Sequence, residues 1–358
     1  MVSKKRSSTK RQGVSHKGIL SVFAMSMVLL AIIWIAFKYY NKIWSSNVIA
    51  TSGSIEIFIP TDPTYEEVFA LLDFSGALVS MDDFDWVVHK KGLENKFEGG
   101  RYLLTNGMSN NEIINMLRSG KQSPVRITFT NVRTVEELAG QLGSRLEPDS
   151  IDFLHAFKSD SILATYNVSQ SSLFGNMLPN TYEMWWTTTP EGFLKRMFRE
   201  YDIFWNDERS AKADAIGLTS FEVLVLASIV DEETVKADEK ARVAGVYINR
   251  LQKGIRLQAD PTIKYVMNDF SVKRILSKDL LIDSPYNTYI YAGLPPGPIR
   301  MPSIQGVEAV LDFEKHNYLY MCAREDFSGY HSFARTLQQH NQNASRYRNA
   351  LQKLKIYR

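Results

Sequence analysis

A run of 20 residues without a charge, Gly18 to Phe37, lies between Lys17 and Lys38 near the start of the chain. As a helix rising 1.5 Å per residue, such a run spans the roughly 30 Å of a bilayer's hydrocarbon core. Residues 1–17 before it carry six basic side chains and no acidic one. Because basic flanks stay on the cytoplasmic side, we predict one transmembrane helix at 18–37, with a cytoplasmic arm before it and the remaining chain outside.

A cleaved signal peptide is the rival interpretation of this run. The apolar core of a signal peptide has about 7–15 residues, and a small-x-small cleavage site follows it. Here the apolar run is longer, and no such site follows directly. A buried helix of a soluble protein would leave the basic arm unexplained. The membrane helix is therefore favoured.

The charge of the remaining chain argues against one class of partner. Outside the arm there are 36 basic and 39 acidic residues, so no basic surface for nucleic acid is expected. Cys322 is the single cysteine, which excludes an intramolecular disulfide and a cysteine-based metal site. HExxH and comparable ligand spacings do not occur in the sequence, so we expect neither a metal nor another cofactor.

Three segments share a pattern typical of helix starts: Ser or Thr, then Glu three residues later, then apolar residues on one face. They are 64–72, 109–117 and 134–142. The Ser or Thr and the Glu together satisfy free amides at the start of a helix, and the apolar spacing gives the helix one buried face. Runs typical of strands, 55–59 and 125–129, precede two of these segments. Such small strand-plus-helix units predict an α+β fold.

Another capping box, Thr219 with Glu222, opens the run from Phe221 to Val230, which is apolar nearly all round. Such a helix is expected to be buried in the core of its domain. A second helix is predicted from about Asp238, and it ends at Gly254, since glycine readily adopts the conformation that closes a helix.

Three acidic residues, Asp231, Glu232 and Glu233, end the buried helix. Glu233 shares a face with Ile229 and Val230, four and three residues before it, and apolar surroundings raise the pKa of a carboxyl. A glycosidase acid needs a raised pKa, because it must hold its proton near neutral pH and then deliver it. A solvated helix end is the alternative, which the residues alone leave open. We expect Glu232 to lie on a more exposed face.

The run LASIVDEET at 226–234 resembles the catalytic motif of the MltG-type (YceG-like) endolytic murein transglycosylases. Further blocks resemble the family in the same order: VAGVYINRL at 243–251, RLQADPT at 256–262, SPYNTY at 284–289, GLPPGPI at 293–299 and GYHSF at 329–333. The likeness covers roughly residues 125–345 and is weaker from 55 to 120. It implies a small LysM-like α+β subdomain at 50–122 and a larger α+β catalytic domain at 125–358, built around the buried catalytic helix.

In this family the motif usually reads VEKET, so the catalytic glutamate falls on Glu233, whereas Asp231 and Glu232 depart from the pattern. The resemblance implies a lytic cut between N-acetylmuramic acid and N-acetylglucosamine in nascent peptidoglycan. Glu233 protonates the linking oxygen and then takes the proton of the muramyl C6 hydroxyl, which leaves a 1,6-anhydro end.

The resemblance also implies where the enzyme acts and with what. The cuts are internal and terminate strand elongation at the bacterial inner (cytoplasmic) membrane. The catalytic domain is then periplasmic, or more generally extracytoplasmic, and works alongside penicillin-binding proteins.

Candidate substrate-binding residues lie in the other blocks: Gln258, Asp260, Tyr286, Asn287, Thr288, Tyr289 and His331. Hydroxyl and amide groups beside aromatic faces suit a saccharide groove. Plainer interpretations stand beside these, such as a turn at Asp260 before Pro261 or a structural role for His331. The roles of Arg250 and of the Trp185-Trp186 pair stay open.

Two other functions compete with the lytic one. A hydrolytic muramidase usually needs a second carboxylate, and Asp260 is the candidate. A catalytically silent cell-wall-binding scaffold would keep the groove and the anchor. Such a scaffold would be expected to lose Glu233, which is present.

Overall fold

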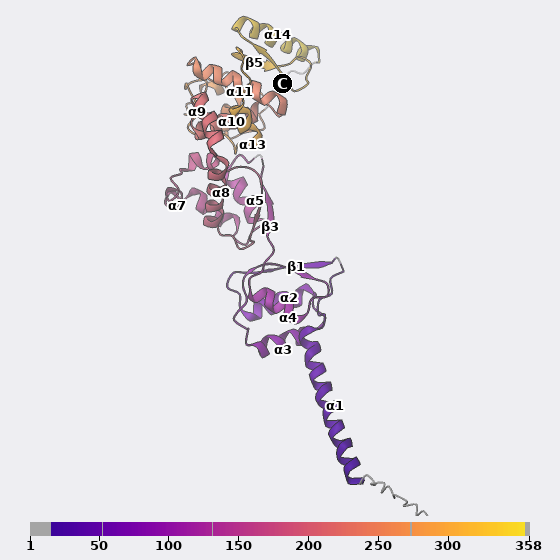
Figure 1. Ribbon diagram of the computed structural model, residues 1–358. Helices are drawn as coiled ribbons and strands as arrows, with labels where there is room; N and C mark the ends of the chain where they lie inside the picture. Colours follow the sequence, from indigo (N-terminus) through magenta and orange to yellow (C-terminus); the bar gives the residue numbers. More distant parts are fainter. Residues whose placement is uncertain (1–15, 52, 131, 273, 355–358) are drawn as a thin grey trace, which may run out of the picture. The chain divides into compact units, whose positions relative to one another are not determined.

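The computed structural model describes residues 16–51, 53–130, 132–272 and 274–354. The chain forms two compact units, residues 1–123 and 124–358, whose elements are labelled in Figure 1. Both units mix helices with antiparallel strand pairs, so the predicted α+β class is confirmed. Of the predicted basic arm, residues 1–15 lie outside the described residues.

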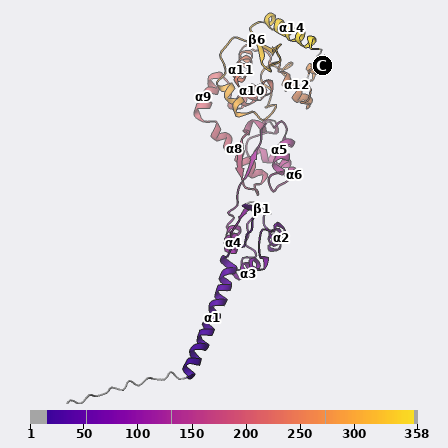
Figure 2. The ribbon, with the colours of Figure 1, turned by 90° about the vertical axis from the view of Figure 1, so that its right-hand side faces the viewer.

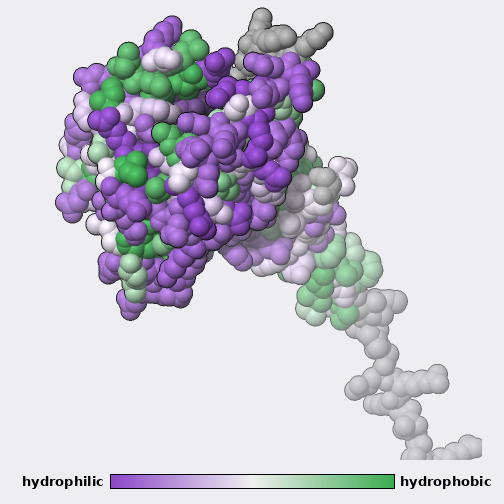
Figure 3. All heavy atoms as spheres, turned by 90° about the horizontal axis from the view of Figure 1, so that it is seen from above, coloured by the Kyte–Doolittle hydropathy of each residue, from purple (hydrophilic) through white to green (hydrophobic). Residues whose placement is uncertain are grey.

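The first unit starts with a long helix, α1, from His16 to Trp44. From Leu20 to Trp44 this helix is long and apolar enough to cross a membrane. Its large hydrophobic side chains are exposed, and Figure 3 shows them in green on the surface. The face of the second unit turned toward the viewer in the same figure is mostly hydrophilic.

The helix α1 extends past the predicted 18–37 because its last turns belong to the folded unit. Tyr39 stacks on Trp86 with ring centroids 5.0 Å apart. The Lys42 ammonium pairs with Asp83. Both partners lie on α3 (Met81–Lys91), so the end of α1 is attached to that helix.

Two strands and two more short helices complete the first unit: β1 (Ser54–Ile59), α2 (Tyr65–Ser75), β2 (Gly100–Thr105) and α4 (Asn110–Arg118). The strands pair antiparallel, with Ile57 opposite Tyr102. The capping boxes predicted at Thr64 and Ser109 are both present. Apolar residues of the helices and strands form one core.

The first part of the second unit contains β3 (Val125–Thr128), α5 (Val135–Gly143), α6 (Ser150–Lys158), α7 (Asp160–Ala164), the 3-10 helix η1 (Gln170–Asn176), β4 (Thr181–Met184) and α8 (Pro190–Phe204). The strand predicted at 125–129 is confirmed. It pairs with β4. The strand β4 was not predicted, because its ladder hydrogen bonds come from β3, a distant segment of the chain. Thr134 caps α5, but the Glu137 carboxylate accepts from the Arg133 amide, so no complete capping box forms here.

The second part contains α9 (Asp207–Ile216), α10 (Ser220–Glu233), α11 (Ala237–Gln252), α12 (Asp260–Met267), the 3-10 helix η2 (Asp279–Leu281), α13 (Ile304–Leu311), β5 (Tyr320–Ala323), β6 (His331–Ala334) and α14 (Leu337–Lys353). Within this unit, Figures 1 and 2 place β5, β6 and α14 at one end and α5 and α8 at the other. The helices α10, α11 and α13 lie between them.

The helix α10 forms the centre of this part. Every residue from Val223 to Asp231 is buried, as the apolar run predicts, and α11, α12 and α13 pack around the helix. The buried Ser228 hydroxyl donates to the Val225 carbonyl at 2.7 Å and accepts from the Ile299 amide at 3.0 Å. The proline-rich loop that ends at Ile299 is thereby attached to α10.

Candidate active site

Glu233 is the last residue of α10, and it meets a tyrosine of the neighbouring helix. Glu233 itself is half-buried. Its Oε1 accepts a hydrogen bond from the hydroxyl of Tyr247 on α11, whose side chain is buried. The packing of α10 against α11 positions the tyrosine, and its hydrogen bond fixes one oxygen of the carboxyl.

Burial raises the pKa of Glu233 to about 6. The hydrogen bond from Tyr247 and the nearby His331 oppose this shift, whereas the Asp260 carboxylate adds to it. With a pKa of about 6, roughly a tenth of the carboxyls keep their proton at pH 7. The same group can therefore deliver a proton and, once ionised, accept one.

A cavity of about 510 Å³ opens at Glu233, within the size range of small-ligand sites. Four of the predicted binding residues line it: Gln258, Asp260, Tyr289 and His331. The remaining walls come mainly from α11, β5 and α14. Among the described residues, no three His, Cys, Asp or Glu side chains gather closely enough to hold a metal ion.

Asp260 and Tyr289 form a pair at this cavity. The Tyr289 hydroxyl donates to Asp260 Oδ1 at 2.6 Å, and burial together with this carboxylate raises the tyrosine pKa. Asp260 also opens α12, with Pro261 in the first turn. Asp260 therefore has both expected features, since it starts a helix before Pro261 and also lines the cavity.

Gln258 is held in the cavity wall by an arginine. Its backbone has φ 51°, a left-handed conformation that is uncommon for a residue with a side chain. Arg250 Nη2 donates both to Gln258 Oε1 at 2.6 Å and to the Arg256 carbonyl at 2.7 Å. Nη1 donates to the Leu319 carbonyl at 2.8 Å. Arg250 thus joins two loops of the cavity wall.

His331 reaches the cavity from β6 and has a buried carboxylate behind it. Its Nδ1 lies 2.8 Å from Glu239 Oε2, and its backbone amide donates to Glu239 Oε1 at 2.7 Å. Glu239, on α11, is only 3% exposed. A carboxylate on one ring nitrogen orients the imidazole, which leaves Nε2 for contacts with a ligand.

Three predicted binding residues, Tyr286, Asn287 and Thr288, do not line the cavity. Asn287 is fully buried, and its Nδ2 donates to two backbone carbonyls of the preceding loop at 3.0 and 2.7 Å. Thr288 Oγ1 accepts from the Ala259 amide at 3.0 Å and bonds the Thr262 hydroxyl at 2.9 Å. These polar groups form hydrogen bonds within the protein, and those of Thr288 stabilise the segment that carries Gln258 and Asp260.

Tyr286 is half-buried and contacts the core. Its ring lies 4.7 Å from that of Tyr265, centroid to centroid, and contacts the core around α10. Burial raises the pKa of its hydroxyl. Asn287 and Thr288 are buried, so the expectation that they contact substrate directly is corrected, whereas the contact expected for Tyr286 stays a prediction.

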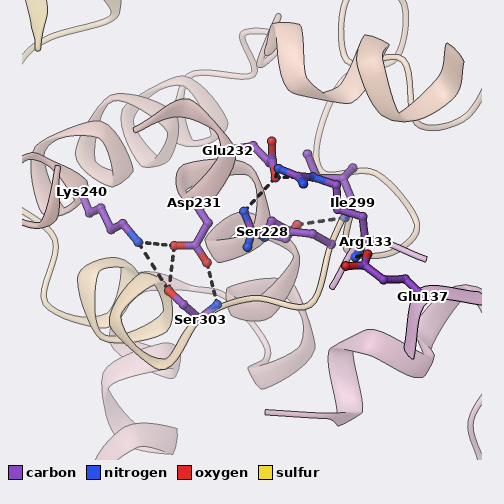
Figure 4. Close-up of polar contacts among 9 residues, drawn as sticks. Arg133, Glu137, Ser228, Asp231, Glu232, Lys240, Ile299 and Ser303 are labelled. Carbon is purple, nitrogen blue, oxygen red and sulfur yellow. Dashed lines mark hydrogen bonds and ion pairs between the residues drawn. The ribbon is translucent and has the colours of Figure 1, made fainter. Parts of the chain in front are cut away.

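The two acidic residues before Glu233 take part in structural ion pairs (Figure 4). Asp231 is buried, and its Oδ1 receives the Lys240 ammonium at 2.5 Å and the Ser303 hydroxyl at 2.8 Å. Its Oδ2 accepts from the Ser303 amide at 2.6 Å. Asp231 therefore joins α10 to α11 and to the start of α13.

Glu232 forms ion pairs with two arginines. Its Oε1 accepts from Arg133 Nε at 3.0 Å and from Arg300 Nη1 at 2.8 Å, and its side chain is 13% exposed. Two arginines from distant segments cover the Glu232 carboxylate, and the expectation that Glu232 lies on a more exposed face than Glu233 stays a prediction. Of the three acids that end α10, Glu233 is the one that lines the cavity.

The profile of the YceG-like family matches residues 57–346, most of the chain. The chain belongs to the YceG-like family. A relative from Bacillus subtilis (strain 168), named endolytic murein transglycosylase, is 29% identical over 329 residues, which cover 87% of this chain and 90% of the relative. A protein of the same name from Streptococcus pneumoniae (strain ATCC BAA-255 / R6) is 26% identical. That match covers 83% of this chain and 59% of the pneumococcal protein.

A solved structure of the same family shares the fold. The crystal structure of a yceG-like protein from Listeria monocytogenes matches with a TM-score of 0.55 at 24% identity. The match covers 82% of this chain and 99% of that one.

Sequence reasoning missed two groups of this YceG-like site. Tyr247 lies within the second predicted helix, and sequence reasoning gave its hydroxyl no role. A buried tyrosine hydroxyl usually has a hydrogen-bond partner, and that signal could have directed attention to a nearby carboxyl. Glu239, in the first turn of α11, carries no such signal, since acidic residues are common in the first turn of helices.

Proposed function

We propose that this chain is a lytic transglycosylase that cuts the glycan strands of peptidoglycan internally, with Glu233 as catalytic acid and base. One observation carries the proposal. A carboxyl with its pKa raised to about 6 ends a buried helix, and it opens into a cavity large enough for sugar residues. The relatives named endolytic murein transglycosylase support this choice of reaction.

In the first step the Glu233 proton passes to the oxygen between N-acetylmuramic acid and N-acetylglucosamine. The bond from that oxygen to muramyl C1 breaks, and its electron pair stays with the oxygen. Because Tyr247 donates to Oε1, we assign delivery of the proton to the other oxygen, Oε2. Positive charge develops at C1, and the ionised carboxylate beside it stabilises that charge.

In the second step the Glu233 carboxylate takes the proton of the muramyl C6 hydroxyl, and O6 forms a bond to C1. The product has a 1,6-anhydro end, no water is consumed, and Glu233 has regained its proton. One carboxyl is sufficient because the nucleophile belongs to the substrate and is already close to its target. A pKa near neutrality suits both steps, since the group acts once as an acid and once as a base.

The surrounding residues bind and orient the sugar in this proposal. Asp260 and Tyr289 present a carboxylate and a phenol, and Gln258 presents an amide. His331, held through Nδ1 by Glu239, offers Nε2. A hydrolytic muramidase would use Asp260 as its second carboxylate, but the relatives named endolytic murein transglycosylase favour the lytic reaction.

We further propose that α1 anchors the enzyme in the cytoplasmic membrane, with residues 1–17 inside and both folded units outside. The six basic residues of the arm support this orientation. Residues 50–122 are proposed to be the LysM-like subdomain that holds glycan, and residues 125–358 the catalytic domain. Penicillin-binding proteins are proposed as partners in strand synthesis.

The mass of the products tests the reaction. Full-length protein in detergent micelles is incubated with purified, uncrosslinked glycan strands, and the fragments are analysed by mass spectrometry. We expect fragments one water lighter than those of a hydrolase, with many lengths produced from the start. Fragments with reducing ends would show that the bond is hydrolysed, as by a muramidase, and would refute the lytic reaction. Release of only terminal disaccharides would refute internal cutting.

A further inference from the structure

A second cavity, of about 710 Å³, lies in the second unit at the face of α8. Its walls come from the end of β4, the turn that follows and one side of α8, which is labelled in Figure 1. It shares no lining residue with the cavity at Glu233. The proposed reaction at Glu233 uses none of its side chains.

An exposed tryptophan forms one wall. Trp185 is 51% exposed, so about half of its surface is open to a ligand. Its position is fixed, because its carbonyl accepts from both the amide of Thr188 at 3.0 Å and the Thr188 hydroxyl at 2.6 Å. The next carbonyl, of Trp186, accepts from the Glu147 amide at 2.9 Å. A rigid turn therefore presents the indole.

Two cations lie near this indole. Lys195 and Arg199 are one helical turn apart on α8, and both are exposed. Neither has an ion-pair partner within the part of the chain that the structure describes, whereas Arg196 between them pairs with Glu200 at 2.6 Å. Like charges at this spacing repel each other. An anion bound between them would relieve the repulsion.

The same cavity also contains acidic and aromatic groups. Glu183 and Asp202 line it, so an amino group of a ligand would find a partner as well. Tyr166 and Phe198, with ring centroids 4.6 Å apart, form its apolar part. The cavity thus combines an aromatic platform with charges of both signs.

We propose that this cavity binds a second segment of the peptidoglycan strand. A sugar ring stacks its apolar C–H face on Trp185, and a carboxylate of a stem peptide pairs with Lys195 and Arg199. The inference rests on the proposed function, because it takes its ligand from there. Binding at two places along one strand raises the effective concentration of the bond to be cut. It favours long, stem-bearing strands over short fragments.

Binding of purified glycan strands to the full-length protein in detergent micelles tests this site. Every protein carries Glu233→Gln so that strands are not cut, and fluorescently labelled, stem-bearing strands are the probe. Trp185→Ala, and Lys195→Gln combined with Arg199→Gln, should each weaken binding about tenfold, as loss of a central contact does. Trp185→Phe should restore most of the affinity. Lys253→Gln with Lys278→Gln removes two exposed charges elsewhere and should leave binding unchanged.

A second probe separates two sources of the carboxylate. Strands whose stem peptides have been removed keep the lactyl carboxylate of the sugar. With these strands Trp185→Ala should still weaken binding, whereas the Lys195 and Arg199 substitutions should lose their effect. An undiminished effect of the charge substitutions would overturn the stem-peptide assignment. Normal binding by Trp185→Ala on stem-bearing strands would overturn the site itself.

The proposed function fails by a different result. If protein with an intact Glu233 produces no anhydro ends from glycan, the function is wrong, whatever the second cavity binds. If it produces them and the Trp185 variant binds normally, only the second site is wrong.

Discussion

Tyr247→Phe is the substitution that probes the catalytic carboxyl without touching it. The phenyl ring keeps the packing of α11, and one hydroxyl, the donor to Glu233 Oε1, is lost. A hydrogen bond to a charged group contributes about 1.5–3 kcal/mol. It stabilises the ionised carboxylate more than the neutral acid, so it lowers the pKa that burial raises. Without it the pKa of Glu233 should increase.

The pH–rate profile measures this effect. The first step needs protonated Glu233, so activity should fall as pH rises through about 6 in the wild type. Since each 1.36 kcal/mol corresponds to one pH unit, the alkaline limb should move up by about one unit or more in Tyr247→Phe. The maximal kcat should also fall, because Oε1 is no longer held, while KM changes little.

Tyr291→Phe is the matched control for this experiment. Its hydroxyl donates to Asp283 at 2.7 Å, an exposed tyrosine–carboxylate pair outside the cavity. Its profile should superimpose on that of the wild type. If the Tyr247→Phe profile also superimposes, or its alkaline limb moves to lower pH, the reasoning about the pKa of Glu233 is refuted.

Three predictions concern the structure around the site. Asn287→Ala leaves two carbonyls without the Asn287 donor and should lower the free energy of unfolding by about 1–3 kcal/mol in thermal or denaturant melts. Unchanged stability together with reduced glycan binding would instead support the predicted contact of Asn287 with substrate. Asp231→Ala leaves the Lys240 ammonium buried and unpaired and should cost about 3–5 kcal/mol, most of it recovered by adding Lys240→Met; additive losses in the double variant would contradict this. Glu232→Gln replaces charge-assisted bonds to two arginines and should destabilise by about 1–2 kcal/mol while the products stay anhydro-ended; loss of all cutting with normal stability would give Glu232 a catalytic role.

Local periodicity predicted the helix that carries the proposed acid. The apolar run 221–230 has no polar face, so only a buried helix suits it, and Glu233 follows on the face of Ile229 and Val230. The raised pKa comes from that burial, which is why the pattern could predict its direction. The capping boxes at Thr64, Ser109 and Thr219 are also local, and all three are present.

Contacts between distant segments could not be predicted in the same way. The tyrosine that holds Glu233 is 14 residues away, and the arginines that cover Glu232 are 99 and 68 residues away. In a turn-rich loop, the amide of Asn287 looks the same whether it faces a sugar or its own backbone. Only the packed structure decides between these two outcomes.

The thermal stability of Glu233→Gln provides the background for the last measurement. The pKa of Glu233 is raised from 4.5 to about 6, so the folded protein binds more protons than the unfolded chain between these values. Stability contributed by this group is therefore lost as pH rises from 4.5 to 6, by up to about 2 kcal/mol. The glutamine has no such charge, still accepts from Tyr247, and should leave stability at pH 7 equal or higher.

Release of 1,6-anhydro ends by Glu233→Gln tests the central claim most directly. Wild type, Glu233→Gln and Glu208→Gln, which changes an exposed glutamate on α9, are compared on the same purified glycan at pH 6 and pH 7. General acid–base assistance is worth about 10²–10⁴-fold in rate, so Glu233→Gln should fall to background while Glu208→Gln matches the wild type. Near-normal release of anhydro ends by a folded Glu233→Gln protein would remove Glu233 from the mechanism.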